Sequence, residues 1–550
     1  MVDGQKTQPN AMKYLAHSVA ELQEKNVVLE LECIDRVYLN AYVPKLMWEG
    51  GVAHYIRGFL GHRFASTKSV AGKTEQFVEA IMEFAQEKKL DVVRFQKGQR
   101  KDDVAKEYLG KFKGREGVLF IGVAQEKARV PRTIRKRVGG GDGKATIPWI
   151  ESGSAMVNHY YFYCVDEDFG PFFIKFCSYF PYGAKLCLNG HEYLKRQLEK
   201  RGIAFKALDN GLQECADIQE AQRLANGLSA EKVDAFFRKW LRRLPHPYTA
   251  KERAAGYRYE LSVLQAEFSL TQVWRRGLHG RCFFEEVIRE NIDLGRAETV
   301  QLIFGRKLTK PTVAAGRCRT RIITEGVQPS IHVYYKDTHV KQYHKEGRAL
   351  RTETTINNTR DFGVGRLLKN LPRLKEIGFA ANRKVLEVEK VSHDCQAGAE
   401  VFEKLQKPAE VDGQHASALR FGDARVQALF CVLMMLSLQI EGFRNRQLRP
   451  LLAQYLGLSE ARITGGRMSY ELRRLRLHGI IERIKGTQRY RLTECGLRTA
   501  AFYSRLYGRV IRPGLSILHD PRTDKRHPLG RHMRNLEREL SHYVEEKIAA

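Results

Sequence analysis

The sequence predicts a mixed α/β protein of several domains, and three observations lead to this expectation. In residues 1–216, amphipathic segments such as 74–88 alternate with strand-like segments such as 117–123. This alternation favours an α/β layer with a partly parallel sheet. From residue 257 to about 405, short apolar runs typical of strands dominate. Between residues 424 and 507, three helical patterns precede a short hairpin pattern and a fourth helix.

The length of 550 residues is compatible with two to four domains. Shifts in composition place their boundaries. We expect an α/β domain over 1–216, a helical linker over 217–256, a mixed β-rich basic domain over 257–405, a compact unit over 406–515 and a basic tail over 516–550.

The strongest global feature is a formal net charge of +30, with a pI near 9.7. Such an excess of positive charge gives information about binding partners and not about the fold, and nucleic-acid phosphate is the commonest partner of a basic protein. A membrane surface is the alternative, but no apolar run approaches the roughly 20 residues needed to span a bilayer. The ten cysteines are scattered, without a Cys-x-x-Cys pair, and the first residues lack a signal-peptide pattern. These features predict a cytoplasmic protein with reduced cysteines.

Residues 127–144 combine a basic run with a glycine-rich run, Gly139-Gly140-Gly141-Asp142-Gly143. We expect a flexible loop that contacts the nucleic-acid backbone, and the alternative is a solvated loop without a partner. The glycines do not form a P-loop, because no Gly-Lys-Ser/Thr follows them. The predicted contacts in this loop are Arg132, Arg135, Lys136 and Arg137.

Acidic residues follow several predicted strands of the first domain: Asp35, Asp166, Asp168 and Asp209. RNase H-like nucleases place three or four carboxylates at strand ends, where they hold two divalent ions. The strand order here is compatible with such a plan. The four aspartates are therefore predicted catalytic and metal-binding residues, with Mg²⁺ as the ion, and His191 is a candidate general base. The alternative is that these acids only form turns and helix caps.

The β-rich middle segment carries many lysines and arginines, interleaved with tyrosines and histidines, and is a second candidate nucleic-acid surface. It also contains His339, Tyr343, His344 and Glu353. A tyrosine nucleophile beside a histidine and an acid is what a replication initiator needs to join itself to a DNA end. This segment faintly resembles rolling-circle initiators, although their paired metal-binding histidines are absent.

Residues 424–507 closely resemble the winged-helix superfamily, because three helices, a hairpin and a helix led by Thr493 follow one another. In that superfamily the third helix enters the major groove and the hairpin wing touches the backbone. Some members bind RNA or protein instead. The resemblance implies contacts from the third helix and the wing: Arg467, Ser469, Tyr470, Arg473, Arg474, Arg476, Lys485 and Arg489.

These observations predict a protein that binds DNA or RNA, and more specifically a magnesium-dependent nuclease or strand-transfer protein of a mobile element or defence system. The rival prediction is a non-catalytic replication, partition or regulatory factor. A tyrosine-dependent initiator is the second alternative.

Overall fold

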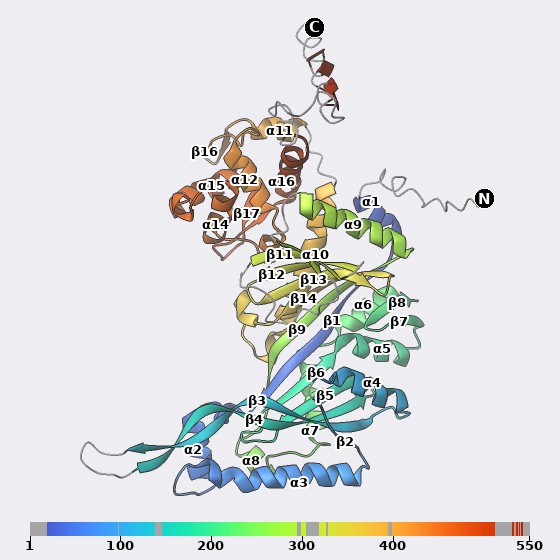
Figure 1. Cartoon of the computed structure of the whole chain (residues 1–550), viewed down its shortest axis with the longest axis vertical. Helices are drawn as coiled ribbons and strands as arrows, with labels where there is room; N and C mark the ends of the chain where they lie inside the picture. Colours follow the sequence, from blue (N-terminus) through green and yellow to red (C-terminus); the bar gives the residue numbers. More distant parts are fainter. Residues whose placement is uncertain are drawn as a thin grey trace, which may run out of the picture.

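The computed structural model describes residues 19–137 except residue 97, then 146–293, 299–303, 318–325, 328–393 and 399–511, with eight further residues between 531 and 542. Most of the predicted basic tail therefore lies outside the described residues. The protein is a mixed α/β protein built around one large mixed sheet (Figure 1). Among the described residues, no helix has the length and apolar character needed to cross a membrane.

Twelve strands form this sheet, in the order β10, β11, β12, β13, β14, β9, β1, β6, β5, β4, β3, β2. The first six strands of the chain that enter it are β1 (Val27–Tyr42), β2 (Val92–Arg94), β3 (Gly117–Arg137), β4 (Thr146–Asp166), β5 (Gly170–Cys177) and β6 (Ala184–Asn189). The other six are β9 (Glu260–Trp274), β10 (Thr299–Ile303), β11 (Cys318–Glu325), β12 (Gln328–Tyr335), β13 (Thr338–Lys345) and β14 (Ala349–Ile356).

The two sets of six strands repeat the same topology on either side of the central β1–β9 pair. In each set a long central strand leads to a strand at the outer edge, and the chain then returns strand by strand to the centre. The edge pairs β2–β3 and β10–β11 are parallel, and every other pair of neighbours is antiparallel. We call the sets the first and second repeat. The sequence shows no matching repeat, because strand order depends on backbone pairing and not on shared side chains.

The sheet joins the segments that were predicted to be separate domains. β1 pairs with β9 along nearly its whole length, from Val27 opposite Trp274 to Tyr42 opposite Glu260. The predicted linker instead forms helices that cover the sheet, α6 (Ile218–Asn226), α7 (Ala230–Leu241) and α8 (Ala250–Ala254). The helix–strand alternation predicted a partly parallel sheet, and the sheet is mixed: β2–β3 and β10–β11 are parallel and the remaining pairs are antiparallel.

One face of the sheet is covered by apolar helices. Phe77 of α3 (Ala71–Glu87) meets Phe176 of β5 edge to face at 5.8 Å, and Trp240 of α7 meets Phe172 at 4.8 Å. In the second repeat, α10 (Leu371–His393) packs against β9 and β14. Burial of each such aromatic side chain contributes roughly 1.5–3 kcal/mol. This layer fixes which side chains point to the opposite face.

The opposite face is covered only at its ends. At one end, α5 (Gly190–Lys200), α6 and the hairpin of β7 (Phe205–Leu208) and β8 (Gly211–Cys215) bury the start of β1. At the other end, α4 (Lys101–Lys111) packs on β3 and β4. Side chains alternate between faces along a strand. Between these two covers most side chains of this face are exposed or half-buried, whereas Asp35 and Arg351 are buried where Asn210 and His191 reach them. We call this region, which spans β6, β1, β9, β14 and β13, the open face.

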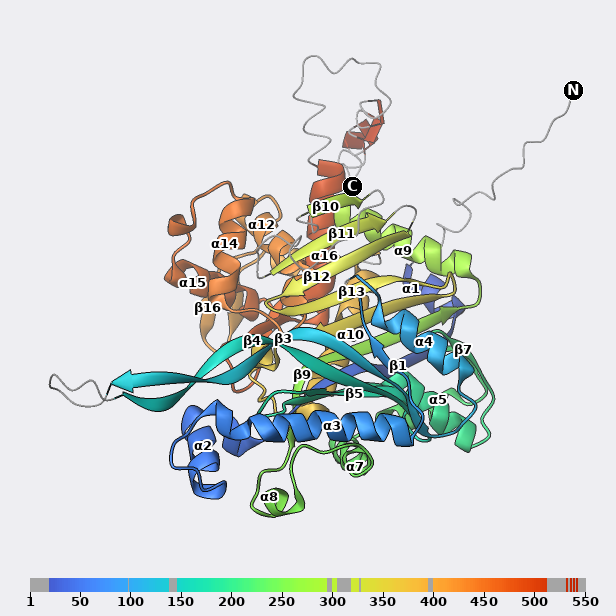
Figure 2. The same cartoon turned by 60° about the horizontal axis from the view of Figure 1, so that its bottom comes forward.

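Beyond the edge of the sheet, β3 and β4 continue as a two-stranded ribbon (Figures 1 and 2). We call its residues 127–137 and 146–156 the arm. It occupies much of the segment that the sequence analysis described as a flexible loop. Pairing runs from Lys127 opposite Met156 to Arg137 opposite Thr146. The glycine-rich residues 138–145 and the side chain of Arg137 lie outside the described part of the chain.

The C-terminal unit has the predicted order of elements, except that the first of the three predicted helices is divided into α12 and α13. It comprises α12 (Ala424–Leu433), α13 (Leu436–Gln439), α14 (Asn445–Tyr455), α15 (Gly465–Leu477), β17 (Ile481–Arg483), β18 (Tyr490–Leu492) and α16 (Glu494–Leu506). A short hairpin of β15 (Ala409–Val411) and β16 (Gln414–Ala416) precedes them. The unit shares one buried cluster with the second repeat, in which Leu433 and Tyr503 join Val333 and Val385.

Candidate functional site

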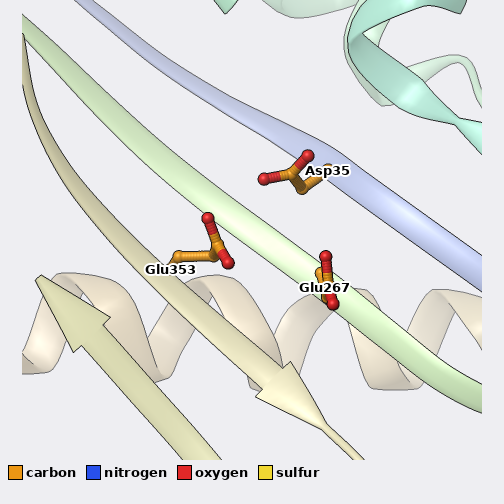
Figure 3. Close-up of side chains that lie close together, drawn as sticks. All are labelled: Asp35, Glu267 and Glu353. Carbon is orange, nitrogen blue, oxygen red and sulfur yellow. The ribbon is translucent and has the colours of Figure 1, made fainter. Parts of the chain in front are cut away.

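Three carboxylates meet at the centre of the open face, near the boundary between the two repeats. Asp35, Glu267 and Glu353 each offer an oxygen, and these oxygens lie within 4.8 Å of one another. The side chains come from the neighbouring strands β1, β9 and β14 and point toward one another (Figure 3). Among the described residues, this is the one group of three or more acidic, histidine or cysteine side chains close enough to share a metal ion. We call it the carboxylate cluster.

A β-bulge aims Asp35 into the cluster. Ile34 pairs with Phe268 and Arg36 pairs with Glu267, so Asp35 is the extra residue between two paired positions. Bulges interrupt the strict alternation of side chains and are common beside active sites because they re-aim one side chain. Asp35 is only 4% exposed, and a buried carboxylate requires compensating partners.

Arg351 supplies that compensation from β14. Its side chain is fully buried, and its Nη2 lies 2.5 Å from Oδ2 of Asp35. Asn210, in the turn of the β7–β8 hairpin, also donates to Asp35. Burial alone would raise the pKa of Asp35, but the Arg351 guanidinium and these donors hold that pKa below its usual value. Asp35 is therefore ionised at neutral pH.

His191 lies on the other side of Arg351, at the first turn of α5. Its Nε2 is 2.9 Å from Nη2 of Arg351 and 2.9 Å from Oγ of Ser269. Burial, followed by the nearby Arg351 charge, lowers the pKa of His191 to about 3. The imidazole is thus neutral near pH 7 and positions Arg351. The predicted role of general base stays untested, although the structure does bring His191 beside Asp35 through this shared arginine.

The two glutamates of the cluster resist ionisation. Burial, and then the charge of Asp35, raises the pKa of Glu353 to about 7, and burial also raises the pKa of Glu267. Glu353 lies 3.5 Å from Nε of Arg351 and accepts a hydrogen bond from Tyr343 Oη at 3.2 Å. Arg351 therefore pairs with Asp35 and Glu353, while the charge of Arg36 acts on Glu267, so two arginines face the three carboxyl groups. A bound proton or a divalent cation would relieve their repulsion, and three carboxylate oxygens are the hard ligands that Mg²⁺ or Mn²⁺ prefers.

Basic and aromatic side chains flank the cluster on both sides. In the first repeat, Nζ of Lys185 lies 5.5 Å from the ring centroid of Tyr38, and Arg36 is exposed beside them. In the second repeat, Nζ of Lys341 lies 4.2 Å from the ring centroid of Tyr343. Each half of the open face thus presents a cation and an aromatic ring beside the carboxylates.

A cavity of about 460 Å³ lies where the open face meets the base of the arm. Asn40, His159 and Lys185 line it from the sheet, and Trp48, which is 68% exposed, lines it from the segment before α2 (Glu49–His54). The open face therefore continues toward the arm through a polar hollow.

Asp166 belongs to a structural network and not to the carboxylate cluster. Its Oδ2 accepts from Lys239 Nζ at 2.7 Å and from Trp240 Nε1 at 2.8 Å, both on α7. Its Oδ1 accepts the backbone N–H of Asp168 at 2.8 Å. Burial alone would raise the pKa of Asp166, but Lys239 and the other donors lower it overall. Asp166 therefore closes a turn and anchors α7.

Asp168 and Asp209 are also held apart from the cluster. Asp168 pairs with Lys200 at 2.6 Å near the end of α5. Asp209 is well exposed and lies 3.7 Å from Lys106 of α4. Of the four predicted metal ligands, only Asp35 is part of the carboxylate cluster, because the other three follow turns and pair with lysines.

Two of the predicted nucleic-acid contacts in the C-terminal unit are buried. Arg474 is 6% exposed, donates to the carbonyls of Ser417 and Ala418, and lies 3.3 Å from Glu471. Arg489 is 8% exposed and donates to the carbonyl of Gly442 at 3.0 Å, besides pairing with Glu441. Both arginines therefore join elements inside the protein, and the prediction that they face nucleic acid is corrected.

The remaining predicted contacts of this unit are exposed: Arg467, Ser469, Tyr470, Arg473, Arg476 and Lys485. The β15–β16 hairpin lies against part of this surface, since Arg473 donates to the carbonyl of His415 at 2.9 Å and Arg476 to Gln414 at 3.2 Å. On the arm, Arg132, Arg135 and Lys136 are exposed.

The tyrosine-dependent alternative finds little support in the geometry. Tyr343 and His344 lie on opposite faces of β13, and His344 packs against Phe284 of α9 (Gly277–Asp293). Burial, together with the neighbouring Glu353, raises the pKa of Tyr343, which makes its phenolate harder to form. His339 stacks on Tyr334 at 4.6 Å.

No family model, curated protein or solved structure matches this chain.

Proposed function

We propose that this protein binds nucleic acid across the open face of its sheet. The observation that carries the proposal is the arrangement of cations and aromatic rings from both repeats on that one face. Lysine and arginine contact phosphate, and exposed tyrosine rings stack on bases. The net charge of +30 acts in the same direction, because it attracts a polyanion at long range.

The C-terminal unit would provide a second contact. We interpret it as a winged helix, in which α15 and the β17–β18 hairpin reach the nucleic acid. Only the exposed residues of α15 can take part, so contact would run through Arg467, Ser469 and Arg473 and not through Arg474. The hairpin β15–β16 would limit how much of α15 is available.

Fluorescence anisotropy with labelled duplex and single-stranded oligonucleotides, over a series of salt concentrations, tests the open-face proposal. The variant Lys185→Ala/Lys341→Ala removes one cation from each repeat. If both contact phosphate, the slope of log K against log salt falls in magnitude by about 1.4 for a single strand and about 1.8 for a duplex.

The control is Lys251→Ala/Arg258→Ala, which removes the same charge from exposed positions on and near α8. Equal slopes for wild type and the open-face variant would contradict the proposal. A similar loss in both variants would indicate only a general effect of net charge.

A second function is favoured by the carboxylate cluster: metal-dependent cleavage or transfer of a phosphodiester bond. Asp35, Glu267 and Glu353 would hold Mg²⁺ or Mn²⁺, and the ion would activate water or stabilise the leaving oxygen. Lys185 and Lys341 would place the phosphate near these ligands. This proposal needs the cluster and does not depend on an RNase H-like fold, which stays a prediction.

Manganese binding, followed by electron paramagnetic resonance, and cleavage of labelled DNA and RNA test this second function. Glu267→Gln should lose metal binding and cleavage and keep nucleic-acid affinity. Asp209→Asn is the matched control, because Asp209 is exposed and outside the cluster. Unchanged metal binding in Glu267→Gln would rule out the proposed ligand set.

A further inference from the structure

We propose that the arm inserts into the major groove of duplex DNA. This inference rests on the proposed nucleic-acid-binding function and adds the kind of nucleic acid and the groove. The arm carries six basic residues and a single acid, Glu151, over its 22 paired positions. Five of the basic side chains are described, and all five are exposed: Lys127, Arg129, Arg132, Arg135 and Lys136.

The arm is an addition to the first repeat. In the second repeat the equivalent connection, from Glu325 at the end of β11 to Gln328 at the start of β12, is two residues long. The sheet is therefore completed there without such a ribbon. The sheet therefore does not require the extra length of β3 and β4. A projecting two-stranded ribbon is also not stable by itself in water, so it does not add stability to the sheet.

One face of the arm is anchored to the body of the protein. Thr133 Oγ1 accepts the backbone N–H of Thr67 at 2.8 Å, and Ile150 is buried in the main core. The backbone N–H of Ser152 donates to Glu49 of α2 at 3.2 Å. These contacts hold the arm against the body of the protein as far as the Thr133–Ile150 pair.

The other face of the arm presents cations and an aromatic ring to solvent. Arg132, Lys136 and Trp149 share this face by strand alternation and register. Nζ of Lys136 lies 4.5 Å from the ring of Trp149, which is 45% exposed. It is also the face that continues into the open face, because Glu126 bonds to Tyr161 and Lys175 on that side of the sheet.

The dimensions of the arm fit a major groove. Four residues in each strand, 134–137 and 146–149, extend past the Thr133–Ile150 pair, and the described ribbon beyond that pair is about 13 Å long at roughly 3.3 Å per residue. The major groove, about 12 Å wide, admits a two-stranded ribbon, whereas the minor groove is only about 6 Å wide. The major groove of double-stranded RNA is deep and narrow. The basic arm therefore fits duplex DNA better than duplex RNA.

The test uses the full chain and a labelled DNA duplex. The variant Arg132→Ala/Lys136→Ala should weaken binding and lower the salt slope by about 1.8 if both side chains contact phosphate. The variant Lys251→Ala/Arg258→Ala serves again as the control for net charge. Methylation of guanine N7, which lies in the major groove, should reduce binding of wild type, and netropsin in the minor groove should not compete.

Each outcome separates the arm from the general proposal. Wild type that binds no nucleic acid would overturn both. Wild type that binds duplex DNA with the same slope as the arm variant, and that is insensitive to N7 methylation, would overturn the arm inference alone. Competition by netropsin without an effect of N7 methylation would place the arm in the minor groove and would overturn the inference. An arm that binds another protein instead would leave the slope for DNA unchanged.

Discussion

Replacement of Glu353 by glutamine should change the pH dependence of stability in a way that follows from the carboxylate cluster. Glutamine resembles the protonated carboxyl group and cannot ionise. The pKa of Glu353 is raised from 4.5 to about 7 in the folded protein. Between these values the folded state binds the proton and the unfolded state does not, so wild type loses stability as the pH rises.

The size of this effect follows from the shift. One pKa unit corresponds to about 1.4 kcal/mol, and titration of both states between pH 5 and pH 8 gives a loss of about 2.5 kcal/mol. The carboxyl group is 17% exposed, so solvent screening reduces the effect only modestly. The free energy of unfolding of Glu353→Gln minus that of wild type should therefore be larger at pH 8 than at pH 5, by about 2.5 kcal/mol.

Urea unfolding of both proteins at the two pH values, in chelator, measures this difference directly. Because the two proteins are compared at each pH, the contributions of the other titrating groups to the free energy of unfolding cancel. The matched control is Glu346→Gln, which changes an exposed carboxyl on the turn before β14 and should give the same difference at both pH values. A pH-independent difference for Glu353→Gln would refute the proposed sharing of a proton in the cluster.

Three further outcomes are expected. Mn²⁺ at a fixed concentration should raise the Tm more at pH 8 than at pH 5, because metal ligands must be deprotonated; an equal shift would argue against the cluster as its site. Arg474→Ala should lower stability by about 2–4 kcal/mol in urea unfolding without changing the salt slope for DNA, because the buried carbonyl of Ala418 loses this donor and the buried Glu471 loses this ion pair. An altered slope would place Arg474 on the binding surface. Arg351→Met should destabilise the protein by about 3–5 kcal/mol, because Asp35 would remain as a buried charge without its cation; a change below about 1 kcal/mol would contradict this explanation.

The C-terminal elements were predictable because their signals are local. The apolar periodicity of α12, α14 and α15 lies within each helix, and Thr493 caps α16 by accepting the N–H of Gly496 at 2.9 Å. The exposure of individual side chains was less predictable. Arg474 and Arg473 are neighbours on the same basic helix, yet only the packing of residues 417 and 418 against α15 buries one of them.

The carboxylate cluster depends on strand pairing that no local pattern reveals. Asp35, Glu267 and Glu353 are far apart in the sequence and meet only because β9 lies between β1 and β14. Asp35 was found because it ends an apolar run. Glu353 was named only as the acid of the tyrosine-dependent alternative. Glu267 was not predicted, although a signal existed, since it is an acid between apolar residues of a strand-like segment, Ala266-Glu267-Phe268. Acids at turns, such as Asp166, were predicted to be metal ligands instead, and in the structure they bind lysine and backbone N–H groups.

Photo-crosslinking gives the most direct test of the central proposal, that nucleic acid lies across the open face. Oligonucleotides that contain bromodeoxyuridine would be irradiated in complex with the full chain, and the crosslinked peptides identified by mass spectrometry. We expect crosslinks at Tyr38 in the first repeat and Tyr343 in the second, on either side of the carboxylate cluster. Crosslinks confined to the helical side of the sheet, around α3 and α7, would contradict the proposal.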